Sequence, residues 1–303
     1  MIKAEFFIQL IGAAFFLILN IYLAKQGFSD PEIANFISYR FLAVMLLAFP
    51  LGFFIKGKPL KPFFLLGSLG VPMVAIALVL AVQNVLFSFL PTLFILWGVV
   101  FTLFQVSALP YVMRNTSVAN QSHAISLNYA THSFGTILSG IIIFGFGQFM
   151  REMDEGIILL FVSVLGFFGV YFLLKMKVDV VVPVNKGLQW KSYDWSLLLK
   201  AIIPTIIIAI GAGLTIPFIN LFFFHNFQID SAGFAVIGGV ASVLVAILAL
   251  LVPNVKNKLG FKKGITYTQT TAVIALVALA TTEFFVSYWW ALPVAVLCFW
   301  VRT

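Results

Sequence analysis

Long apolar runs alternate with short polar segments along the whole chain. A helix that crosses a membrane needs about 20 mostly apolar residues. Nine runs approach or exceed this length, near residues 6–25, 33–55, 62–82, 88–111, 124–149, 156–174, 197–224, 232–253 and 264–283, and a tenth begins near 286. The runs are continuous and show no period of two, which excludes a membrane β-barrel. The pattern therefore predicts an all-α polytopic membrane protein.

The composition supports a lipid environment. Hydrophobic residues make up 62% of the 303 residues and charged residues only 9%, which is too little charge to cover a water-exposed surface. The net charge of +8 comes from basic residues scattered between apolar runs, so we expect the lipid bilayer as partner and no nucleic acid. The single cysteine, Cys298, leaves no thiolate pair for a metal site, and we expect no cofactor.

The basic residues also predict the topology. If the loops are numbered alternately, 14 Lys and Arg residues fall on one side and 3 on the other. Cytoplasmic loops carry the excess of Lys and Arg. The sequence therefore predicts a protein of the cytoplasmic (inner or plasma) membrane with its N-terminus in the cytoplasm.

The two ends of the chain share a pattern. NIYLAKQGFSD at residues 20–30 matches NLFFFHNFQID at 220–230 in its Asn and Asp, and Lys56 and Lys58 match Lys256 and Lys258 at the same offset. Six predicted spans separate the copies, which is typical of a parallel repeat in a transporter. We therefore expect a six-helix bundle at 1–176, a cytoplasmic linker at 177–196 and a second bundle at 197–303. The same offset places Thr303 inside the fourth helix of the second bundle, so we expect this bundle to be incomplete.

The basic segments after the second and eighth spans resemble the loop motif of the major facilitator superfamily, Gly-x-x-x-Asp-(Arg/Lys)-x-Gly-(Arg/Lys)-(Arg/Lys). PNVKNKLGFKK (253–263) aligns Pro253 with the first Gly and Asn257 with the Asp; Lys258 and Gly260 match the motif, and Lys262 and Lys263 follow as its basic tail. GFFIKGKPLK (52–61) keeps Gly52, but Lys56 stands where the motif has Asp. ALPYVMRNTS (108–117) and GAGLTIPFINLFF (211–223) resemble the end of the fourth helix and the seventh helix of the family. The resemblance implies a transporter in which two helix bundles give alternating access.

The segment 253–263 has two interpretations. It is a topology anchor whose lysines reach anionic headgroups, or it latches the two bundles in one state, as the resemblance implies. Gly260 would permit the positive φ that a sharp turn needs. The missing Asp removes a charged acceptor for the basic side chains, and Asn257 supplies only a neutral one.

Polar residues within the spans are the candidates for a substrate cavity, because they are costly in lipid. These candidates are Asn20, Arg40, Gln105, Asn128, His132 and Asn220. Arg40 either snorkels outward or pairs with Asp30 or Glu32, or it attracts an anion at the mouth of the cavity. Asn128, His132, Gly135 and Ser139 share one helix face, which predicts either a cavity wall or a dry helix–helix seam. His132 is a hydrogen-bonded packing residue or a proton carrier.

Two further features bear on mechanism. Gly211, Gly213 and Pro217 interrupt the seventh span, which indicates a gating or binding segment or a simple bend. Acidic residues are confined to loops and span edges such as Glu5 and Glu283. Proton coupling therefore needs His132, Glu283 or further helices, or the coupling ion is not a proton; a proton or sodium ion remains a possible partner.

Together these features favour a secondary transporter that moves a small solute by alternating access. Two alternatives remain: a non-transporting membrane fragment or receptor-like relic, and an integral membrane enzyme. The enzyme is disfavoured because the sequence has no His/Asp/Glu cluster, cysteine pair or phosphate-binding glycine loop.

Overall fold

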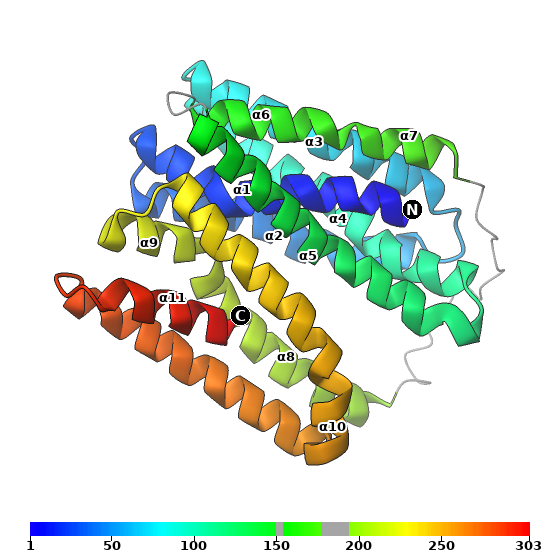
Figure 1. The fold of residues 1–303 in the computed structure, drawn as a ribbon. Helices are drawn as coiled ribbons and strands as arrows, with labels where there is room; N and C mark the ends of the chain where they lie inside the picture. Colours follow the sequence, from blue (N-terminus) through cyan, green and yellow to red (C-terminus); the bar gives the residue numbers. More distant parts are fainter. Residues whose placement is uncertain (150–153, 177–193) are drawn as a thin grey trace.

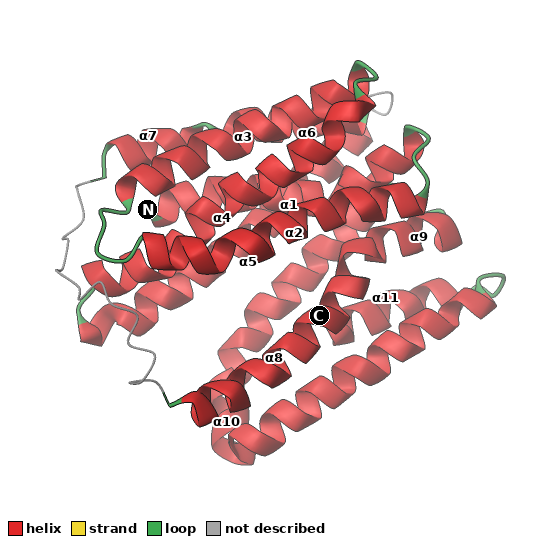
Figure 2. Cartoon of the chain, turned by 180° about the vertical axis from the view of Figure 1, so that it is seen from behind, coloured by secondary structure: helices red, strands yellow, loops and turns green. Residues whose placement is uncertain are grey.

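The computed structural model describes residues 1–149, 154–176 and 194–303. Every regular element in this part of the chain is a helix (Figures 1 and 2). The elements are α1 (Ile2–Lys25), α2 (Asp30–Phe54), α3 (Lys61–Gln83), η1 (Phe87–Phe89), α4 (Leu90–Asn115), α5 (Val118–Phe149), α6 (Glu155–Gly166), α7 (Phe168–Leu174), α8 (Trp195–Thr215), η3 (Ile216–Phe218), α9 (Ile219–Phe227), α10 (Ser231–Thr281), η4 (Thr282–Phe285) and α11 (Ala291–Arg302).

The predicted spans are present as helices. Nine helical stretches of the described residues are long and apolar enough to cross a membrane, and α11 is a shorter apolar helix at the position of the tenth run. Two spans are composite: α6 and α7 together form the sixth, and α8, η3 and α9 together form the seventh. The prediction of an all-α polytopic membrane protein is confirmed.

Polar caps begin several of these helices at the expected positions. The Ser29 backbone N–H donates to the Glu32 carboxylate at 2.8 Å, which completes a capping box at the start of α2. The Asp230 carboxylate accepts a 2.8 Å hydrogen bond from the Gly233 N–H at the start of α10. Such caps satisfy donors that a helix N-terminus otherwise leaves free.

Gly260 turns the chain between the eighth and ninth spans. Its φ of 71° and ψ of 169° break the helical geometry within α10, and Figure 1 shows the ribbon bending sharply near the lower end of this helix. The expectation of a positive φ at Gly260 is confirmed. In the first basic segment the equivalent turn uses Gly57, with φ of 72°, whereas Gly52 lies inside α2.

Helix α1 lies at the centre of the molecule. It is the most buried span, and it contacts α5, α6, α3, α9 and α10. A Cβ built on Gly135 would lie only 3.0 Å from the Gln9 backbone carbon, and Ser139 Oγ donates to the Leu10 carbonyl at 2.8 Å. The small polar face predicted on α5 is therefore mainly a close helix–helix seam against α1.

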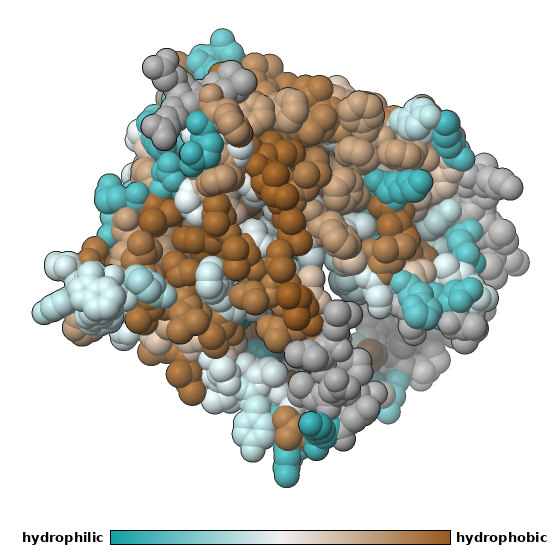
Figure 3. Space-filling model, in the orientation of Figure 1, coloured by the Kyte–Doolittle hydropathy of each residue, from teal (hydrophilic) through white to brown (hydrophobic). Residues whose placement is uncertain are grey.

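The exposed surface is largely apolar. In Figure 3, hydrophobic residues cover the middle of the visible face and hydrophilic residues gather toward its edges. Large apolar side chains stand outward along α2 and α8, including Leu46 at 63% exposure and Ile207 at 65%. Such a surface is compatible with lipid and not with water.

The linker predicted at 177–196 lies mostly outside the described residues, which resume at Asp194. We call α1–α7 the N-terminal group and α8–α11 the C-terminal group, without assuming that they are repeats.

Candidate functional site

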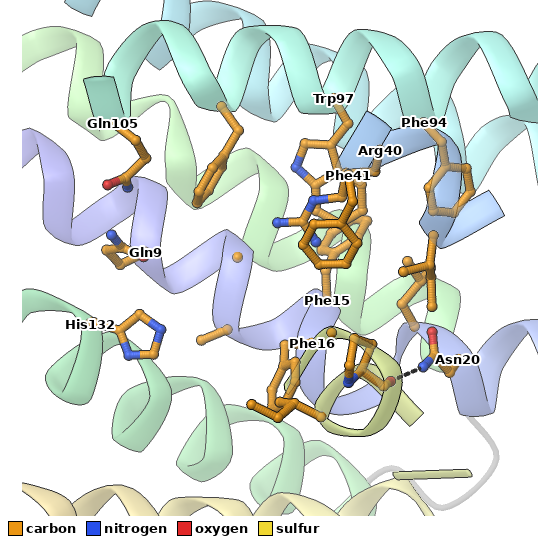
Figure 4. Close-up of a pocket in the computed structure, with 18 of the residues that line it drawn as sticks. Gln9, Phe15, Phe16, Asn20, Arg40, Phe41, Phe94, Trp97, Gln105 and His132 are labelled. Carbon is orange, nitrogen blue, oxygen red and sulfur yellow. Dashed lines mark hydrogen bonds between the residues drawn. The ribbon is translucent and has the colours of Figure 1, made fainter. Parts of the chain in front are cut away.

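A cavity of about 610 Å³ lies between the two groups of helices. Figure 4 shows side chains from several helices pointing toward this space. Its lining residues are Gln9, Gly12, Ala13, Phe15, Phe16, Leu19, Asn20, Ile37, Arg40, Phe41, Phe94, Trp97, Phe101, Gln105, His132, Thr136, Ala209, Ala212, Gly213, Ile216 and Pro217. This volume is in the usual range for small-molecule sites.

Helical spacing brings the polar lining residues together. On α4, Trp97, Phe101 and Gln105 recur every four residues, so they project from one face of the helix. On α1, Gln9, Phe16 and Asn20 likewise share a face. The result is a mostly aromatic wall with a few convergent polar groups.

Arg40 of α2 is the cationic residue of this lining. Its Cζ lies 4.4 Å from the centroid of the Trp97 ring, 5.4 Å from Phe101 and 5.6 Å from Phe41. Its Nε is buried and has no hydrogen-bond partner within the described part of the chain. The guanidinium therefore rests on aromatic faces and retains unused hydrogen-bonding capacity.

The acids nearest to Arg40 in sequence have other partners. Asp30 contacts His225 Nε2 at 3.0 Å, and Glu32 accepts the hydrogen bonds of the Ser29 capping box. The predicted alternative, that Arg40 pairs with one of them, finds no support in the observed contacts.

Gly98 allows Arg40 to take this position. A Cβ built on Gly98 would lie 2.4 Å from the Arg40 carbonyl oxygen and 2.9 Å from Ala43 Cβ. The absence of a side chain thus lets α2 and α4 approach closely beside Trp97. Sequence reasoning missed Gly98, because a lone glycine in an apolar span gives no sign of its neighbour.

Two more buried donors lie along the same wall. Trp97 Nε1 and Gln105 Nε2 have no hydrogen-bond partner among the described residues. Buried polar atoms without partners are uncommon in folded proteins. Both belong to cavity-lining residues, so a bound molecule could supply the missing acceptors.

Four of the six candidate cavity residues line this cavity: Asn20, Arg40, Gln105 and His132. The structure places Asn128 and Asn220 elsewhere. Asn128 donates its side-chain amide to the Glu5 carboxylate in the α1–α5 seam, and Asn220 is buried between α9 and α1. Both therefore hydrogen-bond within the protein.

Asn20 and Asn220, which are separated by 200 residues, contact each other directly. Asn20 Nδ2 donates to Asn220 Oδ1 at 3.0 Å and to the Pro217 carbonyl at 2.6 Å, and Asn220 Nδ2 donates to the Leu17 carbonyl at 3.2 Å. The interruption predicted around Pro217 is present, because α8 ends at Thr215 and the short η3 follows. These bonds attach the interrupted segment to α1 beside the cavity.

Further polar contacts join the two groups at the same end of the molecule. Glu155 at the start of α6 is paired with Lys25 of α1 and accepts a 2.9 Å hydrogen bond from Ser231 of α10. His225 of α9 contacts Asp30 of α2. We call the contacts of Asn20 with Asn220 and Pro217, of Asp30 with His225 and of Glu155 with Ser231 the closed end; the Lys25–Glu155 pair lies within the N-terminal group.

Toward the opposite end, α8 and the second half of α10 diverge from the N-terminal group in both ribbon views (Figures 1 and 2). The two groups therefore meet at one end of the cavity and separate at the other.

Glu5 and Glu155 lie at the ends of helices, as expected for acidic residues, but both are buried. Glu5 is placed by sequence at the edge of a span, yet its side chain is only 2% exposed and is hydrogen-bonded to Asn128. Glu155 is also buried, at 8% exposure. Position along a hydrophobic run gives depth in the bilayer, but burial depends on neighbouring helices that the run itself does not show.

The basic motif residues lie away from the cavity. Lys56, Lys258, Lys262 and Lys263 are exposed, and Gly260 forms the turn. The side chains of Pro253 and Asn257 lie outside the described part. In the first segment, Lys61 donates to the Met176 carbonyl at 2.5 Å, and the Lys58 carbonyl accepts from Arg114 at 2.9 Å. These contacts stay within the N-terminal group.

Comparison with solved structures identifies the arrangement of helices. The inward-facing, unoccupied crystal structure of a bacterial homolog of the human lysosomal transporter Spinster superposes with a TM-score of 0.69 at 14% identity, over 99% of this chain and 72% of that chain. The nucleoside transporter NupG (D323A mutant) gives 0.68 at 15% identity, over 99% of this chain and 78% of that one. The chain has the fold of these transporters. No protein-family model and no curated protein matches the sequence.

At such low identity the similarity concerns the fold alone. The multi-pass membrane architecture expected from the major facilitator resemblance is thus confirmed, and the substrates of these two proteins are not transferred to this chain.

Proposed function

We propose that this protein is a secondary transporter that moves a small solute across the cytoplasmic membrane by alternating access. The observation that carries the proposal is a mostly apolar cavity of about 610 Å³ with a few convergent polar groups, which lies between two groups of helices that are joined at one end and diverge at the other. The structural similarity to two transporters supports the same function.

The proposal assigns a conformation and an orientation. With the N-terminus in the cytoplasm, as the distribution of basic residues predicts, the closed end faces outward and the cavity opens inward. Transport requires a second conformation in which the closed end separates. The contacts of Asn20 with Asn220, of Asp30 with His225 and of Glu155 with Ser231 would then break and re-form in each cycle, and Pro217 would mark the moving segment.

Cysteine labelling tests alternating access without knowledge of the solute. Ala13 lines the cavity, and Ala13→Cys in a Cys298→Ser background places one thiol there. A membrane-impermeant maleimide should label it from the cytoplasmic side in inverted vesicles and, more slowly, from the outside in intact cells. The control is Leu46→Cys on the exposed face of α2, which should remain unlabelled from both sides.

Labelling from one side alone would contradict alternating access and favour the receptor-like alternative. A disulfide across the two groups, between Glu155→Cys of α6 and Ser231→Cys of α10, with Ala13→Cys as a third thiol, provides a further check. Oxidation should block outside labelling and leave cytoplasmic labelling unchanged.

A further inference from the structure

The cavity holds a positive charge that the described protein does not neutralise. Arg40 is the cationic member of the lining, and the described lining includes no Asp or Glu. Arg40 Nε, Trp97 Nε1 and Gln105 Nε2 are all buried and have no acceptor among the described residues. All three atoms are hydrogen-bond donors, and two of them adjoin, since the guanidinium carbon lies 4.4 Å from the Trp97 ring centroid.

Leaving a cation and several donors unpaired is costly. A buried charge without a partner is strongly unfavourable in a low-dielectric environment, and each buried unsatisfied donor adds to this cost. The cation–π contacts with Trp97, Phe101 and Phe41 offset part of the desolvation of Arg40, but they leave the N–H groups unused. The missing partner is an acceptor with negative charge.

The other lining residues indicate the chemistry of the uncharged part of the bound molecule. Phe15, Phe16, Phe94 and Phe101 line it together with Ile37 and Leu19. Phe15 packs edge-on against Trp97 with 4.6 Å between ring centroids. An apolar wall of this kind favours a hydrophobic molecule over a strongly hydrated ion such as chloride.

We propose that the cavity binds a small organic anion, whose charged oxygen atoms contact Arg40 and whose apolar body lies among the phenylalanine rings. This inference rests on the proposed function, because the bound anion is a substrate only if the protein is a transporter. A carboxylate matches the planar donors of a guanidinium, and Trp97 and Gln105 supply further N–H groups along the same wall. The oxygen chemistry is shared by soluble carboxylates and anionic lipid headgroups, and we commit to the soluble solute.

The test is binding to the purified full chain in detergent. The probes are 3-phenylpropionate, its neutral amide 3-phenylpropionamide, and 3-phenylpropylamine, which share the phenylpropyl body and differ in charge. We expect the carboxylate to raise the thermal midpoint and to bind at least about tenfold more tightly than the amide, and the amine to bind weakest, because charge-assisted hydrogen bonds are the stronger ones. Propionate, which lacks the ring, should bind more weakly than 3-phenylpropionate.

Arg40→Met removes the charge and keeps an apolar side chain that can lie on the aromatic rings. We expect it to abolish the preference for the carboxylate over the amide while the thermal midpoint without ligand stays the same or rises, because replacing an unpaired buried charge is often stabilising. Arg40→Lys should retain part of the preference. Arg302→Met, at the end of α11 and outside the cavity lining, is the matched control and should bind as the wild type does.

Three results would overturn the proposal: equal binding of carboxylate and amide by the wild type, an unchanged preference in Arg40→Met, or stabilisation through Arg40 by phosphatidylglycerol but by none of the soluble probes. The last result would assign the site to a lipid headgroup. A different result would contradict the proposed function. If the carboxylate binds through Arg40 but Ala13→Cys is labelled from one side only, the anion site stands and transport does not.

Discussion

Two buried amides connect the two groups of helices through hydrogen bonds. Asn20 donates to Asn220 and to the Pro217 carbonyl, and Asn220 donates back to the backbone of α1. Side-chain amides can both donate and accept, so one pair satisfies several backbone groups at a break in a helix. In the apolar interior, loss of either amide leaves its partners unpaired.

Asn20→Ala should lower the free energy of unfolding by about 1–3 kcal/mol, because the Pro217 carbonyl loses the Asn20 amide donor and Asn220 Oδ1 keeps only the Leu221 N–H. Thermal unfolding of the purified protein measures this, and a double-mutant cycle with Asn220→Ala should give a coupling above about 0.5 kcal/mol. Asn84→Ala, an exposed amide bonded within its own helix, is the control. Additive effects of the two mutations would contradict a direct interaction.

The buried Glu5–Asn128 pair makes a different prediction. Asn128→Leu leaves a buried carboxylate without its amide donor and should cost about 1–3 kcal/mol, whereas Glu5→Leu combined with Asn128→Leu should recover much of that loss, since both polar partners are then removed. Chemical or thermal unfolding of the single and double variants compares the two. A double variant less stable than Asn128→Leu would show that Glu5 is stabilised by other contacts.

At the scale of elements, close approach between helices decides where the side chains lie. Gly135 of α5 lets α1 approach closely, and Gly98 of α4 does the same for α2. The contact between α2 and α4 places Arg40 on the Trp97 ring. The Pro217 break gives a short segment that bonds to α1 rather than continuing α8. The cavity is the space that these contacts leave between interrupted and uninterrupted helices.

Gly98→Ala should destabilise the protein by about 1–3 kcal/mol through overpacking between α2 and α4. Because α2 must shift to relieve this clash, the substitution should also weaken binding of 3-phenylpropionate. Gly239→Ala is the matched control: no heavy atom lies within 4 Å of its added Cβ, and alanine is the better helix former. Ligand-induced shifts of the thermal midpoint for both variants provide the measurement, and an unimpaired Gly98→Ala would contradict the tight contact.

At the scale of the whole molecule, the two groups of helices meet at the closed end, where a hydrogen bond from Ser231 to the Glu155 carboxylate supplements the amide contacts. Lys25 and Glu155 come from α1 and α6, and Ser231 of α10 bonds to the same carboxylate. The strength of these contacts relative to those of the outward-open form would set the population of the two conformations.

Lys25→Glu places two carboxylates together within the N-terminal group, which should displace Glu155 from Ser231 of α10 and shift the population toward separation of this end. We expect faster labelling of Ala13→Cys from outside, and the swap Lys25→Glu with Glu155→Lys should restore the slow rate. Lys3→Glu, at the other end of α1, controls for the change of net charge. No change in the outside labelling rate for Lys25→Glu would exclude this pair as a determinant of closure.

The sequence by itself determined the all-α membrane architecture, the positions of the spans, the turn at Gly260 and the break at Pro217. These features depend on the length of apolar runs and on backbone properties that a residue carries anywhere in the chain. It also identified Arg40 as a cavity candidate, because a charge within an apolar run is costly wherever it lies.

The tertiary structure decided which polar residues face the cavity. It separated Arg40, Gln105, His132 and Asn20 from Asn128 and Asn220, and it revealed the burial of Glu5 and Glu155. Among the described residues, it gave Arg40 aromatic neighbours and no acid. Cavity lining and pairing depend on which faces of distant helices meet. That choice is made by packing between helices, which the periodicity of a single span does not specify.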